Sequence, residues 1–212
     1  MGLFVAFEGP EGSGKTTQIQ LLAAWLVAAG LNVLTTREPG GTRIGDAVRK
    51  ILLDREHTEM QPETEILLFS AARAQIVGQV IRPQLNAGGV VLCDRFSDST
   101  LAYQGYGRKL DLPALRLITT FATGGLRPDK VICLDLPVAE GLRRKQNGDG
   151  SEWNRMECEQ QEFHERVRRG YLALAAAEPD RWLVLDALAP IDLIQRQIRA
   201  QIAPYLGLPV PD

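Results

Sequence analysis

Eight consecutive residues near the start of the sequence have the types and spacing that bind a polyphosphate. Residues 9–16, GPEGSGKT, match the pattern G-x-x-x-x-G-K-[S/T] at every defined position. Glycines let such a loop curl so tightly that its backbone N–H groups surround the phosphate oxygens. Lys15 is then expected to reach the outer phosphates, and the hydroxyl of Thr16 to bind Mg²⁺. The predicted phosphate-binding residues are Gly9, Pro10, Glu11, Gly12, Ser13, Gly14, Lys15, Thr16 and Thr17.

A second chemical feature is an acid and a base at the end of an apolar run. Residues 90–93 are followed by Asp94 and Arg95. An acid at such a strand end resembles the metal-side carboxylate of phosphate-loop proteins, and an arginine beside it can hold a phosphate by two parallel hydrogen bonds. The alternative is that Asp94 and Arg95 only form an ion pair that caps the strand.

Two further candidates lie on predicted helical or loop segments. Phe69 and Arg73 are four residues apart in a predicted long helix, 63–85, so both project from one side of it and could hold one planar molecule. A core phenylalanine with a surface arginine is the structural alternative. Upstream, residues 36–42, TREPGGT, predict a loop in which Thr42 caps the helix that carries Arg49.

Alternating patterns of apolar and helical segments indicate how these residues are positioned. Short apolar runs at 3–7, 31–35, 90–93, 131–136 and 182–185 predict strands, and helical periodicity separates them. Repeated β-α units give a parallel sheet with ligands at the carboxyl ends of its strands. The fold class is therefore α/β: a three-layer fold of the P-loop NTPase type, with about five parallel strands and helices on both faces, in one domain, 1–212.

Charge and hydropathy exclude several classes of protein. The 24 Lys and Arg against 26 Asp and Glu give a net charge of −2, so nucleic acid is not an expected partner. No apolar run is long enough to span a membrane, and the first strand follows Met1 so closely that we expect no signal peptide and a cytoplasmic location. Cys93 and Cys133 fall in apolar runs and are expected to be buried, whereas His57 and His164 are expected to be solvated rather than zinc ligands.

Residues 141–155 begin as a helix and then become rich in Gly, Asn, Asp and Ser. This pattern predicts a flexible basic flap, since a mobile loop with Arg and Lys can surround the charge that develops in phosphoryl transfer and exclude water. An exposed loop with solvated charges is the alternative. The candidate cations are Arg143, Arg144, Lys145 and Arg155.

These motifs together resemble one family. Residues 8–17 (EGPEGSGKTT), 37–42 (REPGGT) and 94–105 (DRFSDSTLAYQG) occur in the order found in bacterial thymidylate kinases, which are phosphate-loop nucleoside monophosphate kinases. The resemblance covers nearly the whole chain. It implies a cytoplasmic homodimer that transfers the γ-phosphoryl group of ATP to dTMP, giving dTDP and ADP, with Mg²⁺ required.

The resemblance also implies roles for individual residues. Phe69 would stack on thymine, and Arg73 would bind its carbonyl edge, while Tyr103 would exclude a ribose 2′-OH by bulk. Glu11 would face the deoxyribose hydroxyl. Asp94 and Glu38 would lie near the metal or the acceptor, and which of the two carboxylates takes which role is left open; with Thr16, Asp94 is the candidate metal ligand. The implied dTMP-binding residues are Glu11, Glu38, Pro39, Arg49, Phe69, Arg73, Arg95, Ser99, Thr100, Tyr103 and Gln104.

One departure from the family concerns the catalytic cation. Some members carry an arginine inside the phosphate loop, where this chain has Gly12, and many bacterial relatives have an arginine-rich flap, whereas residues 146–151 here are polar. We expect Arg155 and Arg144 to act in catalysis beside Lys15, Asp94 and Arg95, and Arg143 to contact ATP. The alternatives are a kinase of another nucleoside monophosphate or of a deoxynucleoside, or a nucleotide-binding switch without kinase activity.

Overall fold

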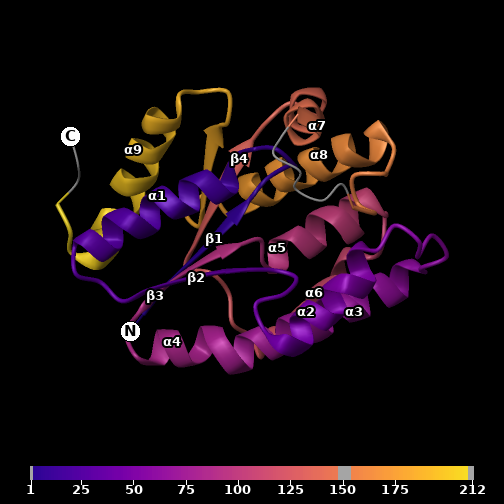
Figure 1. Ribbon diagram of the computed structural model, residues 1–212, viewed down its shortest axis with the longest axis horizontal. Coiled ribbons are helices and arrows are strands. Elements are labelled where there is room, and N and C mark those ends of the chain that lie inside the picture. Colours follow the sequence, from indigo (N-terminus) through magenta and orange to yellow (C-terminus); the bar gives the residue numbers. More distant parts are fainter. Residues whose placement is uncertain (1, 148–153, 210–212) are drawn as a thin grey trace.

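One parallel sheet forms the centre of the computed structural model, which describes residues 2–147 and 154–209. Its strands are β1 (Leu3–Glu8), β2 (Val33–Arg37), β3 (Val90–Asp94), β4 (Lys130–Asp135) and β5 (Trp182–Asp186). They lie in the order β2-β3-β1-β4-β5, and all four neighbouring pairs are parallel (Figure 1). The α/β class and the five parallel strands expected from the sequence are confirmed.

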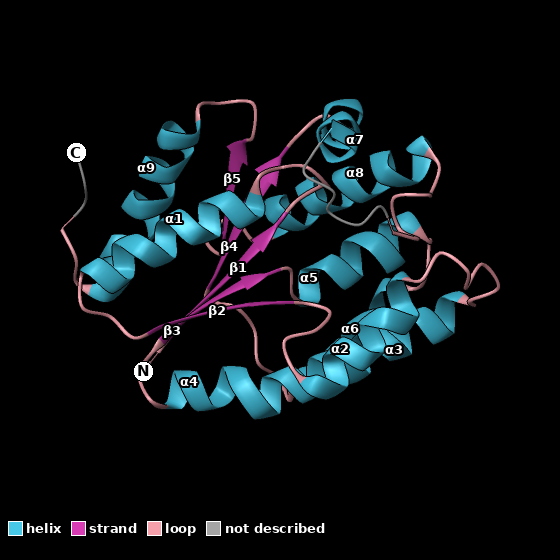
Figure 2. Cartoon of the chain, in the orientation of Figure 1, coloured by secondary structure: helices cyan, strands magenta, loops and turns pink. Residues whose placement is uncertain are grey.

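Helices lie on both sides of this sheet (Figure 2). The helices are α1 (Lys15–Ala28), α2 (Arg43–Leu53), α3 (Pro62–Ile76), α4 (Arg82–Asn86), α5 (Ser97–Thr100), α6 (Leu112–Thr123), α7 (Val138–Asn147), α8 (Gln161–Ala177) and α9 (Ile191–Ile202). Two π-helical segments, η1 (Val77–Ile81) and η2 (Leu101–Gly107), and a 3₁₀ turn, η3 (Ala203–Leu206), complete the described elements.

Alternating side chains of the buried strands divide the core into two clusters. Leu3, Val5 and Phe7 of β1 face α1 and α9, whose apolar residues recur at helical spacing, whereas Phe4 and Ala6 face the cluster that includes residues of α3, α6 and α8. Both faces of the sheet are therefore buried, as expected for parallel strands that read as continuous apolar runs.

The second strand begins two residues later than the sequence pattern predicted. The prediction was 31–35, but β2 is Val33–Arg37. Gly30, with φ of 83°, ends α1 in a left-handed conformation, and the N–H of Leu31 donates to the carbonyl of Leu26. Because the N–H of Leu31 is hydrogen-bonded to the end of the preceding helix, it is not available for a hydrogen bond in the sheet.

The predicted long helix, 63–85, is present as a continuous helical run with one irregular stretch. It consists of α3, η1 and α4, and the π-helical stretch spans Val77–Ile81. Pro83 has no N–H, and its ring disfavours the standard hydrogen bond to the residue four positions earlier, so a local widening of the helix is expected just before it.

The remaining general expectations have mixed outcomes. Cys93 and Cys133 are buried, as predicted, but His164 is buried in α8 with its Nε2 unpartnered, so the prediction that it is solvated was wrong. The predicted flap, 141–155, includes residues 148–153, which lie outside the described residues. Among the helices of the part of the chain that the structure describes, none is long and apolar enough to span a bilayer.

The packing of α1 gives a test of the core. Leu22 is fully buried between α1 and the sheet. The substitution Leu22→Ala is expected to lower the free energy of unfolding by about 2–5 kcal/mol, because it removes apolar contacts and leaves a cavity. Chemical denaturation measures this change. Val27→Ala, on the exposed side of the same helix, should change it by no more than about 0.5 kcal/mol; equal losses in the two variants would contradict this packing.

Candidate active site

A cavity of about 610 Å³ opens at the carboxyl edge of the sheet, beside the ends of β1, β2 and β3. In the parallel sheet, Asp94 of β3 lies between Phe7 of β1 and Arg37 of β2, so residues that are far apart in sequence meet there. The predicted residues that line the cavity are Glu11, Gly12, Ser13, Gly14, Lys15, Thr16, Glu38, Pro39, Arg49, Phe69, Arg73, Asp94, Arg95, Ser99, Thr100, Tyr103, Gln104 and Lys145.

The loop between β1 and α1 has the conformation that its glycines predict. Gly9 has φ of 130°, and a Cβ there would lie 2.4 Å from the carbonyl oxygen of Leu134. Gly12 has φ of 69°, and a Cβ there would lie 2.3 Å from the carbonyl oxygen of Gly141 in α7. Glycine is therefore required at both positions, both for the backbone conformation and for the close approach of neighbouring strands and helices.

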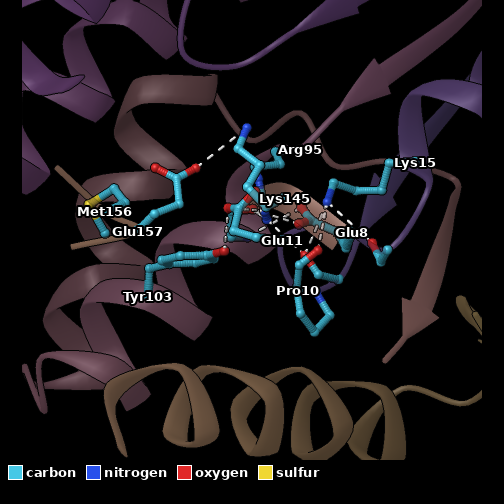
Figure 3. Close-up of polar contacts among 12 residues, drawn as sticks. Glu8, Pro10, Glu11, Lys15, Arg95, Tyr103, Lys145, Met156 and Glu157 are labelled. Carbon is cyan, nitrogen blue, oxygen red and sulfur yellow. Dashed lines mark hydrogen bonds and ion pairs between the residues drawn. The ribbon is translucent and has the colours of Figure 1, made fainter. Parts of the chain in front are cut away.

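Lys15 lies over this loop with its ammonium group buried (Figure 3). Its Nζ donates to the carbonyl oxygens of Gly9 (3.3 Å) and Pro10 (3.0 Å) and to Oγ of Ser13 (3.4 Å). Burial and the neighbouring Arg95 lower the pKa of Lys15, while nearby acids oppose that shift. The loop thus holds a partly desolvated cation at the point where the motif predicts contact with phosphates.

Arg95 has several partners in the site. It has φ of 67°, an uncommon conformation for a residue other than glycine. Its guanidinium group pairs with Glu11 (2.6 Å) and donates to the carbonyl of Gly9 (3.0 Å) and to the hydroxyl of Tyr171 (2.9 Å). The Asp94–Arg95 ion pair considered as the alternative is not the contact formed.

Glu11 and Tyr103 complete this arrangement (Figure 3). The hydroxyl of Tyr103 donates to Glu11 (3.0 Å), and the Arg95 guanidinium lies 5.0 Å from the centre of the Tyr103 ring. Burial alone would raise the pKa of Glu11, but Arg95, Lys15 and Tyr103 lower it to about 2. Glu11 is therefore a carboxylate at any pH near neutrality.

Glu8 is a structural acid of the site that the sequence reasoning did not assign. It is fully buried at the end of β1 and accepts hydrogen bonds from the N–H of Phe96 (2.9 Å), Oγ of Ser99 (2.6 Å) and the hydroxyl of Tyr171 (2.9 Å). It thereby fixes the segment that follows Arg95. Its signal in the sequence is a charged residue that ends an apolar strand directly before Gly9.

Thr16 and Asp94 lie side by side, as the metal-site prediction requires. Oγ1 of Thr16 donates to Oδ2 of Asp94 over 3.3 Å, and both residues line the cavity. A hydroxyl and a carboxylate are oxygen ligands suited to Mg²⁺, so the chemistry of the two side chains fits the expected ion.

Arg73 and Phe69 have the reverse of the burial expected from residue type alone. Arg73 is 1% exposed, whereas Phe69 is half-buried and lines the cavity. Nε of Arg73 pairs with Glu38 (2.7 Å), and its Nη1 donates to Oγ1 of Thr100 (2.9 Å). The alternative of a core phenylalanine with a surface arginine is therefore wrong, and the helix presents both side chains to the cavity.

The loop after β2 ends in Thr42, which caps α2, and α2 carries one more cation of the site, Arg49. Oγ1 of Thr42 accepts from the N–H of Gly45 (2.9 Å), so Thr42 caps α2 as predicted. From α2, Nη1 of Arg49 donates to the carbonyl of Pro39 (3.0 Å). Arg49 and Arg95 both line the cavity.

The cations predicted from the flap are divided by the structure. Lys145 lines the cavity and pairs with Glu157 (3.6 Å), whereas Arg143 and Arg144 both pair with Glu140 at 2.7 Å and do not line it. Arg155 also lies off the cavity, because its guanidinium is bound to Glu65 and to the carbonyl of Leu52. Gly9 and Pro10 of the loop and Thr17 of α1 do not line the cavity.

Several lining residues were not predicted as site residues. Phe96 and Leu53 are apolar, and their side chains had no sequence signal beyond that of core residues. Asn154 lies near the end of the flap and Met156 and Glu157 follow it; the N–H of Asn154 donates to Glu157 (2.8 Å). Burial and the charge of Glu11 raise the pKa of Glu157. Only the tertiary structure brings this segment to the cavity.

A five-stranded parallel sheet with a glycine-rich lysine loop between β1 and α1, and with an acid on the neighbouring strand, defines a phosphate-loop nucleotide-binding protein. Comparison with known proteins gives the particular family. The family model described as thymidylate kinase matches residues 7–198. The chain belongs to the thymidylate kinase family, so the identification made from the sequence motifs is confirmed.

Curated relatives and a solved structure agree with this assignment. A thymidylate kinase of Roseiflexus sp. (strain RS-1) is 56% identical, over 98% of this chain and 96% of the relative. A thymidylate kinase of Deinococcus radiodurans is 52% identical, over 95% of this chain and 97% of the relative. The crystal structure of thymidylate kinase from Ehrlichia chaffeensis matches with a TM-score of 0.74 and 32% identity, over 93% of this chain and 96% of that one.

The buried pair of Glu38 and Arg73 predicts a pH dependence of stability. Burial raises the pKa of Glu38 from 4.5 to about 7, although Arg73 opposes the shift. Between these values the folded chain binds more protons than the unfolded chain, so the contribution of Glu38 to the free energy of unfolding falls as pH rises from about 4.5 to about 7. Denaturation of Glu38→Gln across this range should show a smaller fall than the unsubstituted chain. Glu63→Gln, at an exposed position of α3, should retain the full fall; identical profiles for all three would contradict the prediction.

Proposed function

We propose that this chain transfers the γ-phosphoryl group of ATP to dTMP, giving dTDP and ADP. The observation that carries the proposal is a single cavity that combines the lysine loop with a half-buried aromatic ring and a buried guanidinium group. Membership of the thymidylate kinase family supports it. The comparisons give no support to a deoxynucleoside kinase, another monophosphate kinase or a non-kinase switch.

The residues divide between donor and acceptor. The loop from Gly9 to Thr17 would bind the phosphates of ATP through backbone N–H groups, with Lys15 between donor and acceptor. Thr16 and Asp94 would hold Mg²⁺, which when bound neutralises charge on the phosphoryl oxygens. Arg95, already oriented by Glu11, and Arg49 would hold the phosphate of dTMP. No covalent intermediate is required, since alignment and charge stabilisation supply the rate.

The acceptor base would lie against Phe69. Its face offers a stacking surface, and Arg73, Thr100 and Gln104 surround it with fixed polar groups. Glu38 and Pro39 would bound the subsite on the β2 side, and Ser99 the phosphate side. Glu11 and Tyr103, hydrogen-bonded to each other, would face the deoxyribose. This division of roles follows the family pattern and fits the positions of the side chains.

The catalytic cation of the flap is part of the proposal. Lys145 already lines the cavity, so it is the first candidate for the catalytic cation. A catalytic role for Arg155 or Arg144 requires the guanidinium group to leave Glu65 or Glu140, and contact of Arg143 with ATP likewise requires it to leave Glu140. We propose such a rearrangement when both nucleotides bind, with the flap at 141–155 acting within one kinase domain, 1–212, in the cytoplasm.

The proposed reaction is tested by an acceptor screen. ADP production is measured with ATP and Mg²⁺ and with dTMP, dUMP, dCMP, dGMP, AMP or thymidine, beside a blank without acceptor. Strong preference for dTMP is expected, and Lys15→Ala should lose nearly all turnover because the phosphates lose their cation. Preference for thymidine or for another monophosphate would refute the proposed acceptor, and turnover equal to the blank would favour a switch.

Tyr103 gives a second prediction. If its bulk excludes a ribose hydroxyl, Tyr103→Ala should raise kcat/KM for ribothymidine monophosphate relative to dTMP by about tenfold or more, as expected when a small pocket change admits one extra group. Tyr103→Phe keeps the ring and loses only the hydrogen bond to Glu11, so it serves as the matched control. Selectivity that is unchanged in the alanine variant would rule out steric exclusion.

We also propose a homodimer, formed through α3 and α6. These helices pack against each other and expose Leu67 (59%), Leu117 (74%) and Phe121 (89%), an apolar surface of the kind that proteins bury in interfaces. Phe121→Glu should therefore shift the mass measured by light scattering from dimer to monomer. Leu188→Glu, at an exposed apolar position outside these helices, is the control and should remain dimeric. A monomeric unsubstituted chain would contradict the proposal.

A further inference from the structure

Glu65 has no part in the roles described above, yet it is a deeply buried acid beside the cavity. It lies in α3, one turn before Phe69, with a side chain 1% exposed. Its carboxylate accepts hydrogen bonds from Nε2 of Gln104 (2.8 Å), from Nη2 of Arg108 (3.0 Å) and from Nη2 of Arg155 (2.5 Å). One carboxylate therefore joins α3 to η2 and to Arg155 at the end of the flap.

The two arginines keep Glu65 ionised. Burial alone would raise the pKa of the Glu65 carboxyl group, but the hydrogen bonds and charges of Arg108, Gln104 and Arg155 lower it below its usual value. An ionised carboxylate accepts hydrogen bonds and cannot donate one. Whatever group faces it must therefore be a donor.

This requirement fixes the orientation of the Gln104 side chain. Its amide has a donor nitrogen and an acceptor oxygen on opposite sides, and only the nitrogen can face Glu65. A half-turn of the amide would place its oxygen against the carboxylate, where two acceptors repel each other. Gln104 is 1% exposed and lines the cavity, so the amide oxygen is the group that it can offer to a bound base.

An acceptor at this position distinguishes pyrimidine bases. Thymine and uracil carry an N–H at N3, between two carbonyl groups, whereas N3 of cytosine is an acceptor. We propose that Glu65 is a specificity-determining residue that acts through Gln104, holding its amide oxygen towards the cavity so that the site accepts a base with an N3–H and rejects cytosine. The inference rests on the proposed function, because it requires the base to lie against Gln104.

The expected discrimination is large because the contact is buried. Cytosine would leave the Gln104 oxygen facing another acceptor, and an unpaired buried polar group typically changes binding by about tenfold or more. Replacing Glu65 by glutamine removes the constraint, since a neutral amide at 65 can accept or donate and so allows Gln104 to rotate. The role is one of positioning, because Glu65 itself does not line the cavity.

The test compares kcat/KM for dTMP and dCMP in the unsubstituted chain and in Glu65→Gln. The ratio of kcat/KM for dTMP to kcat/KM for dCMP is expected to fall by about tenfold in the variant, chiefly through a lower KM for dCMP. A merely structural role would lower kcat/KM for both acceptors by the same factor and leave the ratio unchanged. That result would overturn the inference.

Two further variants separate Gln104 from the other partners of Glu65. Arg108→Gln removes one ion pair of Glu65 but keeps its contact with Gln104, so the ratio should stay as in the unsubstituted chain even if stability falls. In a Gln104→Met background, Glu65→Gln should change the ratio no further, because the two substitutions remove one interaction. An equal change of ratio in Arg108→Gln, or an additive change in the double variant, would contradict an action through Gln104.

Binding of base analogues to the unsubstituted chain tests the inference without any requirement that a variant folds. The inhibition constants of dCMP and of N3-methyl-dTMP should each be at least about tenfold higher than the dissociation constant of dTMP, since neither offers an N3–H. Equal binding of all three would overturn the inference even if Glu65→Gln fails to fold. Failure of the unsubstituted chain to phosphorylate dTMP would instead refute the proposed function, so the two failures are distinguishable.

Discussion

The pairing of β1 with β3 is the constraint on which the arrangement of the site depends. Phe7 lies opposite Asp94, and the N–H of Arg95 donates to the carbonyl of Phe7 (2.9 Å), so the lysine loop and the Asp94–Arg95 segment leave the sheet as neighbours. Backbone hydrogen bonds of the sheet therefore determine that Thr16 meets Asp94 and that Arg95 meets Glu11. A shift of this register would turn alternate side chains to the other face and separate these groups.

The site concentrates charged groups that are buried or nearly so, and each is stabilised by specific partners. Glu8 receives hydrogen bonds from residues around Ser99, Arg73 is paired with Glu38, and Glu65 joins two arginines to Gln104. Burial of an unpaired charge costs several kcal/mol, so removal of one partner is more disruptive than the net value of the pair suggests. The same pairs hold side chains in fixed orientations before any ligand binds, which is the condition for electrostatic catalysis.

The cations after β4 differ from this fixed group in their contacts. Gly141 of α7 lies so close to the loop that a Cβ there would be 2.3 Å from the carbonyl oxygen of Glu11, so the base of the flap is packed directly against the loop between β1 and α1. Arg144 and Arg155 are paired with acids away from the cavity, while Lys145 faces it. The flap therefore presents a lysine to the cavity, whereas these two arginines are held by acids outside it.

Much of this protein was determined by the sequence alone. The spacing of the glycine-lysine loop and the alternation of apolar runs with helical periodicity predicted the five parallel strands and the cavity-lining residues 12–16, Asp94 and Arg95, because these features are local and depend on backbone geometry. Phe69 and Arg73 could be placed on one helix face for the same reason, but not their burial. Ser99, Thr100, Tyr103 and Gln104 were expected in the site only through the family resemblance. The predicted start of β2 was two residues too early, because the N–H of Leu31 donates to the carbonyl of Leu26 at the end of α1. An apolar sequence pattern does not reveal that hydrogen bond.

Only the tertiary structure decided the partners of the charged groups. Glu8 and Glu65 were given no role from the sequence, because their hydrogen bonds to Ser99 and Gln104 join residues that are 91 and 39 positions apart. Arg155 resembles a catalytic cation in the sequence, yet it is bound to Glu65 because folding brings a buried carboxylate within its reach. Strand and helix patterns depend on short-range periodicity, whereas an ion pair depends on distances in space, and those are set only when the whole sheet and its helices are packed.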